Sequence, residues 1–155
     1  MNQHSDIKIY LGADHAGFPL KERIRQFLVS EGYATADMGA NRLTPGDDYP
    51  DYIAPVAKKV SEDPIHARGI ILGASGQGEA MMANRFPHVR AAVWYGKNER
   101  IITLSREHND ANILSLGALF VHDDEAVRAV ELWLETPFSG DERHKRRIDK
   151  IDNIL

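Results

Sequence analysis

A single glutamate, Glu79, follows a glycine-rich segment at a position where its carboxylate could act as a general base. The segment, Gly73-Ala-Ser-Gly-Gln-Gly78, lies between a short apolar run and residues with a helical pattern. Glycines let a backbone fold closely round a ligand, and the free N–H groups of such a turn join those of a helix N-terminus to form an anion site. A carboxylate is unfavourable beside a phosphate, but it suits a site where an oxyanion forms as the carboxylate removes a proton. The segment therefore indicates proton-transfer chemistry, unless Glu79 only complements the dipole of its helix.

The segments that must position Glu79 alternate between strand-like and helix-like patterns. Strands are predicted at residues 7–11, 33–38, 69–72, 90–94 and 113–116, and helices at about 18–30, after Tyr49-Pro50, at 98–106 and at 124–134. Strands that alternate with helices of this length predict a parallel sheet covered on both faces. We therefore expect residues 1–155 to form a single three-layer α/β/α, Rossmann-like domain. It would have a five-stranded parallel sheet, a C-terminal helix and a flexible N-terminus over residues 1–6.

The composition narrows the classes of function. The chain has 155 residues and no cysteine, which excludes disulfides, thiolate metal sites and thiol nucleophiles. Its formal net charge of −4 gives no general reason to bind nucleic acid or a membrane. No apolar run approaches the roughly 20 residues that span a bilayer, and residues 1–6 lack the pattern of a signal peptide. We therefore expect a cytoplasmic protein without nucleic-acid or membrane partners.

Candidate polar residues converge at one edge of the expected sheet. Asp14 and His15 follow the first strand, and Ser75 and Glu79 follow the third. Ligands of such sheets bind beyond the carboxyl ends of the strands, so these four residues predict a site. The segment His108-Asn109-Asp110 instead precedes the fifth strand, at the opposite edge. It could reach a site across a dimer interface, or it could simply end a helix, as Asn and Asp often do.

The basic segment near the C-terminus has a helix-start pattern. Ser139 and Glu142 have capping-box spacing, which predicts a helix beginning at Ser139. Arg143 and Arg147 then lie four residues apart on one face, where like charges are unfavourable unless an anion lies between them. The alternative is a solvated basic face with local acidic partners.

Six motifs in order resemble the ribose-5-phosphate isomerase B family, which includes galactose-6-phosphate isomerase subunits. The resemblance extends from residue 7 to about residue 151. The motifs are Gly12-Ala-Asp14-His15-Ala-Gly17, Asp48-Tyr49-Pro50, Gly73-Ala-Ser75-Gly76-Gln-Gly78, Ala83-Asn84-Arg85, Arg106-Glu-His108-Asn109-Asp110 and Arg143-His-Lys-Arg-Arg147. The resemblance implies metal-free and cofactor-free interconversion of aldose and ketose phosphates through a cis-enediolate, in pentose phosphate metabolism.

The family resemblance also implies a role for each matching residue. One subgroup has a cysteine base at the position of Gly73, and the other has a glutamate at the position of Glu79. The resemblance gives Glu79 the proton transfer between C2 and C1, and His108 the opening of the sugar ring. The amides of the turn would stabilise the enediolate. Sugar oxygens would be held by Ser75, Asp14 and Asn109, and other residues would hold the phosphate or line the site. These others are His15, Arg143 and Arg147 for the phosphate, and Tyr49, Gly73, Ala74, Gly76, Gln77 and Gly78 for the lining. Two protomers build the site in this family, so a homodimer or a dimer of dimers is implied.

One position departs from the family pattern. Members usually continue Gly-x-Arg after the fifth strand, with the arginine at the phosphate, but this chain reads Gly117-Ala118-Leu119. A lost charge-assisted contact to phosphate is worth about 1.5–3 kcal/mol if nothing replaces it. Either the remaining residues suffice, Arg42 in the polar loop before Asp48 substitutes, or the substrate is another sugar or hexose phosphate. That loop is where we expect substrate length to be read.

Rival functions have weaker support in the sequence. The glycine spacing is not that of a dinucleotide site, it follows the third strand, and no acidic residue ends the next strand at Trp94-Tyr95. A Walker A site is excluded, because Gly78 is not followed by Lys and Ser or Thr. The histidines lack metal-site spacing, and His4, His66, His88 and His122 have the pattern of loop or surface residues. A sugar-phosphate sensor that has lost catalysis stays open because of Leu119.

Overall fold

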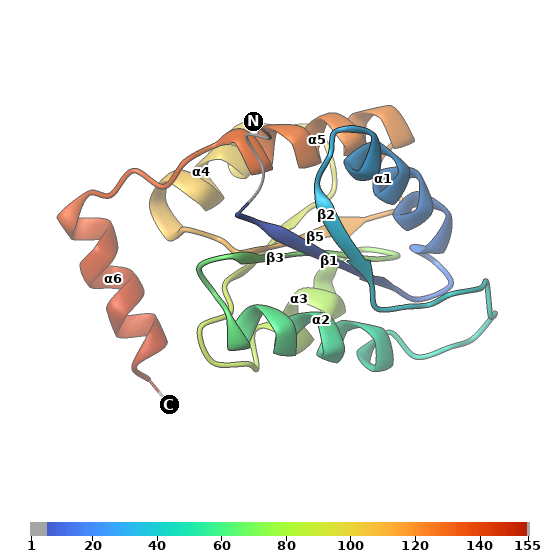
Figure 1. Ribbon diagram of the computed structural model, residues 1–155, viewed down its shortest axis with the longest axis horizontal. Coiled ribbons are helices and arrows are strands. Elements are labelled where there is room, and N and C mark those ends of the chain that lie inside the picture. The colour runs from blue at the N-terminus through green and yellow to red at the C-terminus, as the bar shows by residue number, and fades with distance from the viewer. Residues whose placement is uncertain (1–5, 155) are drawn as a thin grey trace.

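The protein is described from a computed structural model over residues 6–154. Apart from Asp6, the expected flexible N-terminus lies outside the described residues, as does His4. Five strands form one all-parallel sheet in the order β2-β1-β3-β5-β4 (Figure 1). They are β1 (Lys8–Ala13), β2 (Ala34–Asp37), β3 (Ala67–Gly73), β4 (Ala91–Trp94) and β5 (Ile113–Gly117). The prediction of a five-stranded parallel sheet is confirmed.

Helices cover both faces of this sheet and complete three layers. Two apolar clusters show which helices share a face, because each cluster joins sheet residues to one set of helices. One face carries α1 (Phe18–Ser30), α4 (Arg100–Asn109) and α5 (Asp123–Glu135), and the other carries α2 (Pro50–Glu62) and α3 (Gln77–Ala83). The three-layer α/β prediction is confirmed. None of the helices within residues 6–154 is both long and apolar enough to cross a membrane.

The central strand β3 shows why its sequence is a continuous apolar run. Ile70 and Leu72 point into the cluster on the α1 side, and Ile71 points into the cluster on the α2 side. Successive side chains of a strand face opposite sides of the sheet, so a strand covered on both faces needs apolar residues at every position. This burial holds β3 rigidly beneath the glycine-rich turn that follows it.

Helix α4 is longer at its C-terminus than the predicted range 98–106. The Asn98 side chain accepts the backbone N–H of Arg100 at 3.0 Å, so Asn98 lies before the helix. At the other end, Arg106 and Asp110 pair at 2.8 Å across the last turn, and Asp110 ends the helix in the left-handed conformation with φ of 45°. His108 is therefore a helical residue and not part of the turn after the helix.

Helix α6 (Glu142–Asp152) lies apart from the sheet and packs against α4 (Figure 1). The predicted start at Ser139 is wrong: Asp141 precedes the first helical residue, and Gly140 has a left-handed φ of 73°. Ser139 is used differently, because its hydroxyl accepts the Asp141 N–H at 3.2 Å and bonds the ring of His144 at 2.8 Å. Ser139 therefore orients the loop that leads into α6 and does not cap the helix.

Candidate active site

The turns after β1 and β3 meet at the place where the sheet changes winding direction. From β1 the chain goes to β2 through α1, and from β3 it goes the other way to β4 through α3. These two helices lie on opposite faces, and we refer to the space beyond the carboxyl ends of β1 and β3, where sheets of this kind bind ligands, as the crevice. The crevice is flanked by Asp14 and His15 on one side and by Ser75 and Glu79 on the other. The predicted convergence of these four residues at one sheet edge is observed.

The carboxylate of Glu79 fills the space that a side chain at position 73 would need. A Cβ atom on Gly73 would collide with the Glu79 carboxylate, so glycine at 73 and glutamate at 79 are spatially coupled. Gly78 has a similar constraint, because a Cβ there would lie 2.6 Å from the hydroxyl oxygen of Tyr49. The glycines therefore bring a carboxylate and a phenol directly against the backbone of the turn.

Burial makes Glu79 a stronger base than an ordinary carboxylate. The residue is 4% exposed. Desolvation raises its pKa, the negative charge of Asp14 raises it further, and a hydrogen bond from the backbone N–H of Glu79 opposes these effects. A raised pKa strengthens the attraction of the ionised carboxylate for a proton, as general-base catalysis near neutral pH requires.

The glycine-rich turn is held in shape by the segment that follows β5. Backbone N–H groups of Ala118 and Leu119 donate to the carbonyls of Gly73 at 2.8 Å and Ala74 at 3.1 Å. The Ser115 hydroxyl donates to the carbonyl of Gly76 at 2.6 Å, and Gly76 has a left-handed φ of 77°. These bonds engage three carbonyls of the turn and fix its backbone, and Ser75 Oγ accepts the N–H of Gln77 at 3.3 Å.

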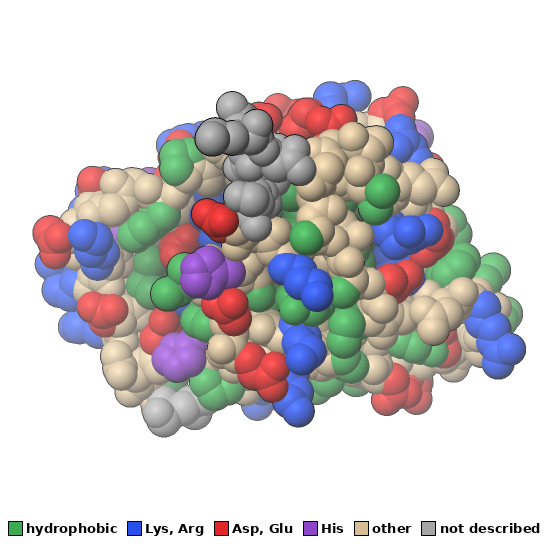
Figure 2. All heavy atoms as spheres, viewed as in Figure 1, with side chains coloured by type: hydrophobic (Ala, Val, Ile, Leu, Met, Phe, Trp, Pro, Cys, Tyr) green, Lys and Arg blue, Asp and Glu red, His purple; other side chains and the backbone are tan. Residues whose placement is uncertain are grey.

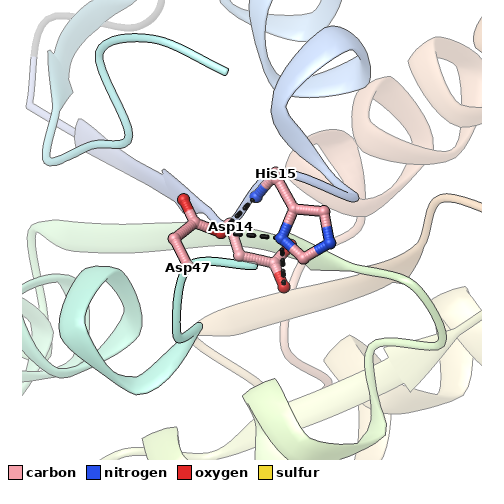
Figure 3. Close-up of side chains that lie close together, drawn as sticks. All are labelled: Asp14, His15 and Asp47. Atoms are coloured by element: carbon pink, nitrogen blue, oxygen red, sulfur yellow. Dashed lines mark hydrogen bonds and ion pairs between the residues drawn. The ribbon is translucent and has the colours of Figure 1, made fainter. Parts of the chain in front are cut away.

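The turn after β1 presents His15 beside two carboxylates, as Figure 3 shows. Asp14 Oδ1 accepts the N–H groups of Ala16 at 3.0 Å and Gly17 at 3.2 Å, which closes the turn. Asp47 Oδ1 accepts both the backbone N–H of His15 at 2.9 Å and its ring Nδ1 at 2.7 Å. The ring is thus fixed from the loop that connects β2 to α2.

Asp14, His15 and Asp47 also form a group with the donor types of a metal site, since one atom of each lies within 4.8 Å of the others. The geometry fits a hydrogen bond better than shared coordination. Nδ1 and Oδ1 are 2.7 Å apart and directed at each other, and Figure 3 shows the second Asp47 oxygen pointing away from the ring. A common ion would need both lone pairs turned toward it.

The other predicted residues lie at the far end of the sheet in the same protomer. His108 is at the C-terminus of α4, which approaches the amino end of β5, and its ring stacks on His144 of α6 at 4.3 Å. Arg143 and Arg147 are exposed on α6, and Figure 2 shows Lys and Arg side chains at the end of the molecule that α6 forms. One protomer therefore brings Asp14, Ser75 and Glu79 together but leaves the second predicted group, His108, Asn109, Arg143 and Arg147, at the opposite edge.

Three residues beside the crevice were not predicted from the sequence: Lys21, Asp47 and Tyr52. The fully buried Lys21 pairs with Asp37 and donates to the carbonyl of Ala40, both at 2.7 Å, which anchors the start of the 41–48 loop. Tyr52 packs against Gly39 in the same region. A lysine on the apolar face of a predicted helix is the one local signal that could have pointed to this anchor.

Comparison with known proteins shows which protein family has this architecture. The protein family described as Ribose/Galactose Isomerase matches residues 9–151. The chain belongs to this family, and the resemblance that its six motifs predicted is confirmed.

The chain is also similar to individual members of the family that are ribose-5-phosphate isomerases of type B. A ribose-5-phosphate isomerase B of Mycobacterium tuberculosis is 40% identical over 145 residues, which cover 94% of this chain and 88% of the relative. The crystal structure of ribose-5-phosphate isomerase B from Mycoplasma genitalium with bound ribulose-5-phosphate has a TM-score of 0.90 at 37% identity and covers 94% of each chain. The solved structure of ribose-5-phosphate isomerase B from Clostridium thermocellum has a TM-score of 0.88 at 41% identity, over 96% of this chain and 97% of the other.

Proposed function

We propose that this protein interconverts ribose 5-phosphate and ribulose 5-phosphate through a cis-enediolate, with Glu79 as the base. The observation that carries the proposal is the buried Glu79 carboxylate against Gly73, with its pKa raised by burial and by Asp14. A carboxylate in this state, beside a turn of backbone amides, suits removal of a proton next to a carbonyl. The relative that holds ribulose 5-phosphate has the same fold and supports the choice of substrate.

The proposed reaction moves one proton between neighbouring carbons and needs no external oxidant or reductant. Glu79 takes the C2 proton of the open-chain aldose, and the amides of residues 73–78 stabilise the negative charge on the C1 oxygen. Protonated Glu79 then returns the proton to C1, while the hydroxyl proton passes from O2 to O1. Ser75 and Asp14 hold the sugar oxygens on the same edge as Glu79.

The remaining residues act from a second copy of the chain. In this proposal His108 opens the sugar ring, Asn109 holds a hydroxyl, and Arg143 and Arg147 join His15 of the first protomer at the phosphate. Two apolar surfaces fit such a dimer. Tyr95, Leu119 and Phe120 are exposed beside the glycine-rich turn, and a hollow of about 370 Å³ lies at the other edge between β4 and α6, beside Asn109. A twofold contact would set one protomer's far edge beside its partner's crevice. We propose a cytoplasmic location for this small-molecule chemistry.

The Glu79→Gln variant tests the base directly. Glutamine keeps the shape and hydrogen bonding of Glu79 but is not basic, so kcat for ribose 5-phosphate should fall about 10²–10⁴-fold while KM changes little. Protein made in a host without its own isomerases excludes contamination, and Glu131→Gln on the exposed face of α5 is the matched control. A kcat near that of the wild type in Glu79→Gln would remove Glu79 from the mechanism.

A second candidate function rests on Leu119, which is 72% exposed where its backbone bonds Ala74 of the turn. Leu119 carries no positive charge that could contact a phosphate. The substrate could therefore be a different sugar or hexose phosphate, or the protein could bind a sugar phosphate without catalysis. Rates measured on a panel of pentose and hexose phosphates distinguish these alternatives. Turnover highest on ribose 5-phosphate supports the first proposal, turnover highest on a hexose phosphate supports the second, and binding without turnover indicates a sensor.

A further inference from the structure

The proposal above places His15 at the substrate phosphate, but it gives no role to Asp47, which bonds the His15 ring. The carboxylate is 7% exposed and comes from the 41–48 loop, whereas the imidazole is 40% exposed and borders the crevice. An ionised carboxylate can only accept hydrogen bonds, so the ring Nδ1 at 2.7 Å carries the proton. Figure 3 shows the other ring nitrogen, Nε2, pointing away from both Asp14 and Asp47. The pair thus leaves the second ring nitrogen, Nε2, available to a ligand, and Nε2 is a donor when the ring is protonated.

Charges around the ring favour its protonated form. The hydrogen bond to Asp47 raises the pKa of His15 above its ordinary value, the charges of Asp14 and Asp47 add to this, and desolvation opposes it. Burial opposes ionisation of Asp47, but hydrogen bonds from the backbone and ring of His15 and from Tyr52 hold its pKa below the usual range. Both hydrogen bonds from His15 go to Asp47 Oδ1, and Asp47 Oδ2 accepts no hydrogen bond of good geometry. His15 is therefore the main partner of the Asp47 carboxylate. Burial and Asp47 raise the pKa of Tyr52, while the positive charge of Arg42, in the 41–48 loop, lowers it.

We propose that Asp47 is a positioning residue for substrate binding, which holds the ring of His15 so that the Nε2–H of an imidazolium faces the substrate phosphate. This inference rests on the proposed function, because it takes the substrate to be a sugar phosphate. A phosphate accepts a stronger hydrogen bond from a charged donor than from a neutral one. Asp47 therefore links the 41–48 loop to the phosphate end of the crevice without touching the substrate.

The chain contains a second pair with the same local geometry, which provides a control. Asp63 Oδ1 accepts the backbone N–H of His66 at 3.2 Å and its ring Nδ1 at 3.0 Å. Both residues are exposed and lie between α2 and β3, at the amino edge of the sheet. The double hydrogen bond alone therefore does not mark a site. Asp47 differs because it is buried and lies beside the crevice.

The experiment compares Asp47→Asn, Asp47→Glu and Asp63→Asn with the wild type. Asparagine can still accept the hydrogen bonds of His15 but carries no charge, whereas glutamate keeps the charge. The titration of the His15 ring is followed by NMR, with and without inorganic phosphate, and KM and kcat for ribose 5-phosphate are measured from pH 6 to 9. The substrate phosphate also titrates in this pH range, but it does so equally for every variant. Differences in KM between variants therefore report on the charge of His15.

In Asp47→Asn the His15 titration should move to lower pH, and the response of the ring to phosphate should weaken. At pH 7.5 KM should rise about fivefold to tenfold, the difference between a charge-assisted and a neutral hydrogen bond, with kcat changed less. The KM gap should narrow toward pH 6, below the ordinary imidazole pKa of about 6.5, because protonation of the ring increases in the variant there. Asp47→Glu should restore the titration in part, and Asp63→Asn should leave KM unchanged.

An unchanged His15 titration in a folded Asp47→Asn protein would overturn the proposal. So would a KM increase that is equal at every pH, since a merely structural loop defect does not follow ring protonation. Failure of the proposed function is a different result. In that case the wild type does not isomerise ribose 5-phosphate, while the titration and the phosphate response still decide whether Asp47 sets the charge of His15.

Discussion

Two of the buried carboxylates that border the crevice, Glu79 and Asp47, have surroundings that move their pKa values in opposite directions. Glu79 gains protons more easily than an ordinary glutamate because of desolvation and Asp14, whereas Asp47 loses its proton more easily because of its hydrogen bonds from His15 and Tyr52. Acid–base roles commonly follow from such a separation of pKa values between nearby groups. We infer that Glu79 is suited to exchange a proton with substrate and that Asp47 is suited to remain charged.

The buried charge of Glu79 should reduce the stability of the fold at neutral pH. Its pKa is raised on folding, so the stability it contributes is fully present below the unfolded glutamate pKa of about 4.3 and is lost as the pH rises through the folded-state value. Replacing Glu79 with Gln should therefore raise the free energy of unfolding at pH 7.5 by about 1–3 kcal/mol, because a buried charge is replaced by a neutral amide. Thermal unfolding at pH 7.5 and pH 4 measures this.

The gain should shrink toward zero at pH 4, because Glu79 is then protonated and glutamine resembles its neutral form. Glu131→Gln, on an exposed surface, should show no such pH-dependent difference. Equal or lower stability of Glu79→Gln at pH 7.5 would contradict the argument that this carboxylate is strained by burial.

At the scale of secondary-structure elements, the site depends on where helices end relative to the strands. Helix α3 begins at the carboxyl edge with Glu79 in its first turn, while α4 ends at the amino edge with His108 in its last turn. Helix α6 adds exposed basic residues to the edge of His108, and the ring of His144 packs against that of His108. Each edge thus holds part of the predicted chemistry.

Helix α6 should act as a phosphate-binding element through Arg143 and Arg147. Substituting either residue with Ala should raise KM for the sugar phosphate about tenfold or more and change kcat less, because a charge-assisted contact made equally in ground and transition states is lost. Steady-state kinetics on ribose 5-phosphate at fixed ionic strength measures this. Lys145→Ala is the control, since Lys145 is exposed on the same helix and, two residues from both Arg143 and Arg147, lies on another face. Unmoved KM values in both variants would leave α6 as a solvated basic surface.

At the scale of the whole molecule, local patterns predicted the fold and one edge of the site. Alternation of apolar runs and helical spacing was sufficient to predict the parallel sheet, and the strand ends were sufficient to bring Asp14 together with Glu79. The sequence did not predict Asp47, because its place depends on a loop anchored by Lys21 far away in the chain. Nor did it predict the contact between His108 and His144, which joins two helices that share no sequence pattern.

The start of α6 was mispredicted for a related reason. The spacing of Ser139 and Glu142 fits a capping box, but the hydroxyl of Ser139 bonds His144 and the backbone of Asp141. Tertiary context thus overrides a local pattern where a loop must cross from α5 to a helix packed on α4. Local patterns specify elements well and specify their connections poorly.

In the dimer that we propose, two protomers complete each active site, with Glu79 from one and His108 from the other. Glu79→Gln and His108→Ala proteins, each inactive alone, are mixed in equal amounts under conditions that exchange subunits, and isomerase activity on ribose 5-phosphate is measured. Random exchange makes half of the dimers heterodimers, each with one intact site of two, so about a quarter of the wild-type activity should return. Exchange is verified independently with differently tagged chains. A mixture that demonstrably exchanges subunits and stays inactive would contradict the shared site.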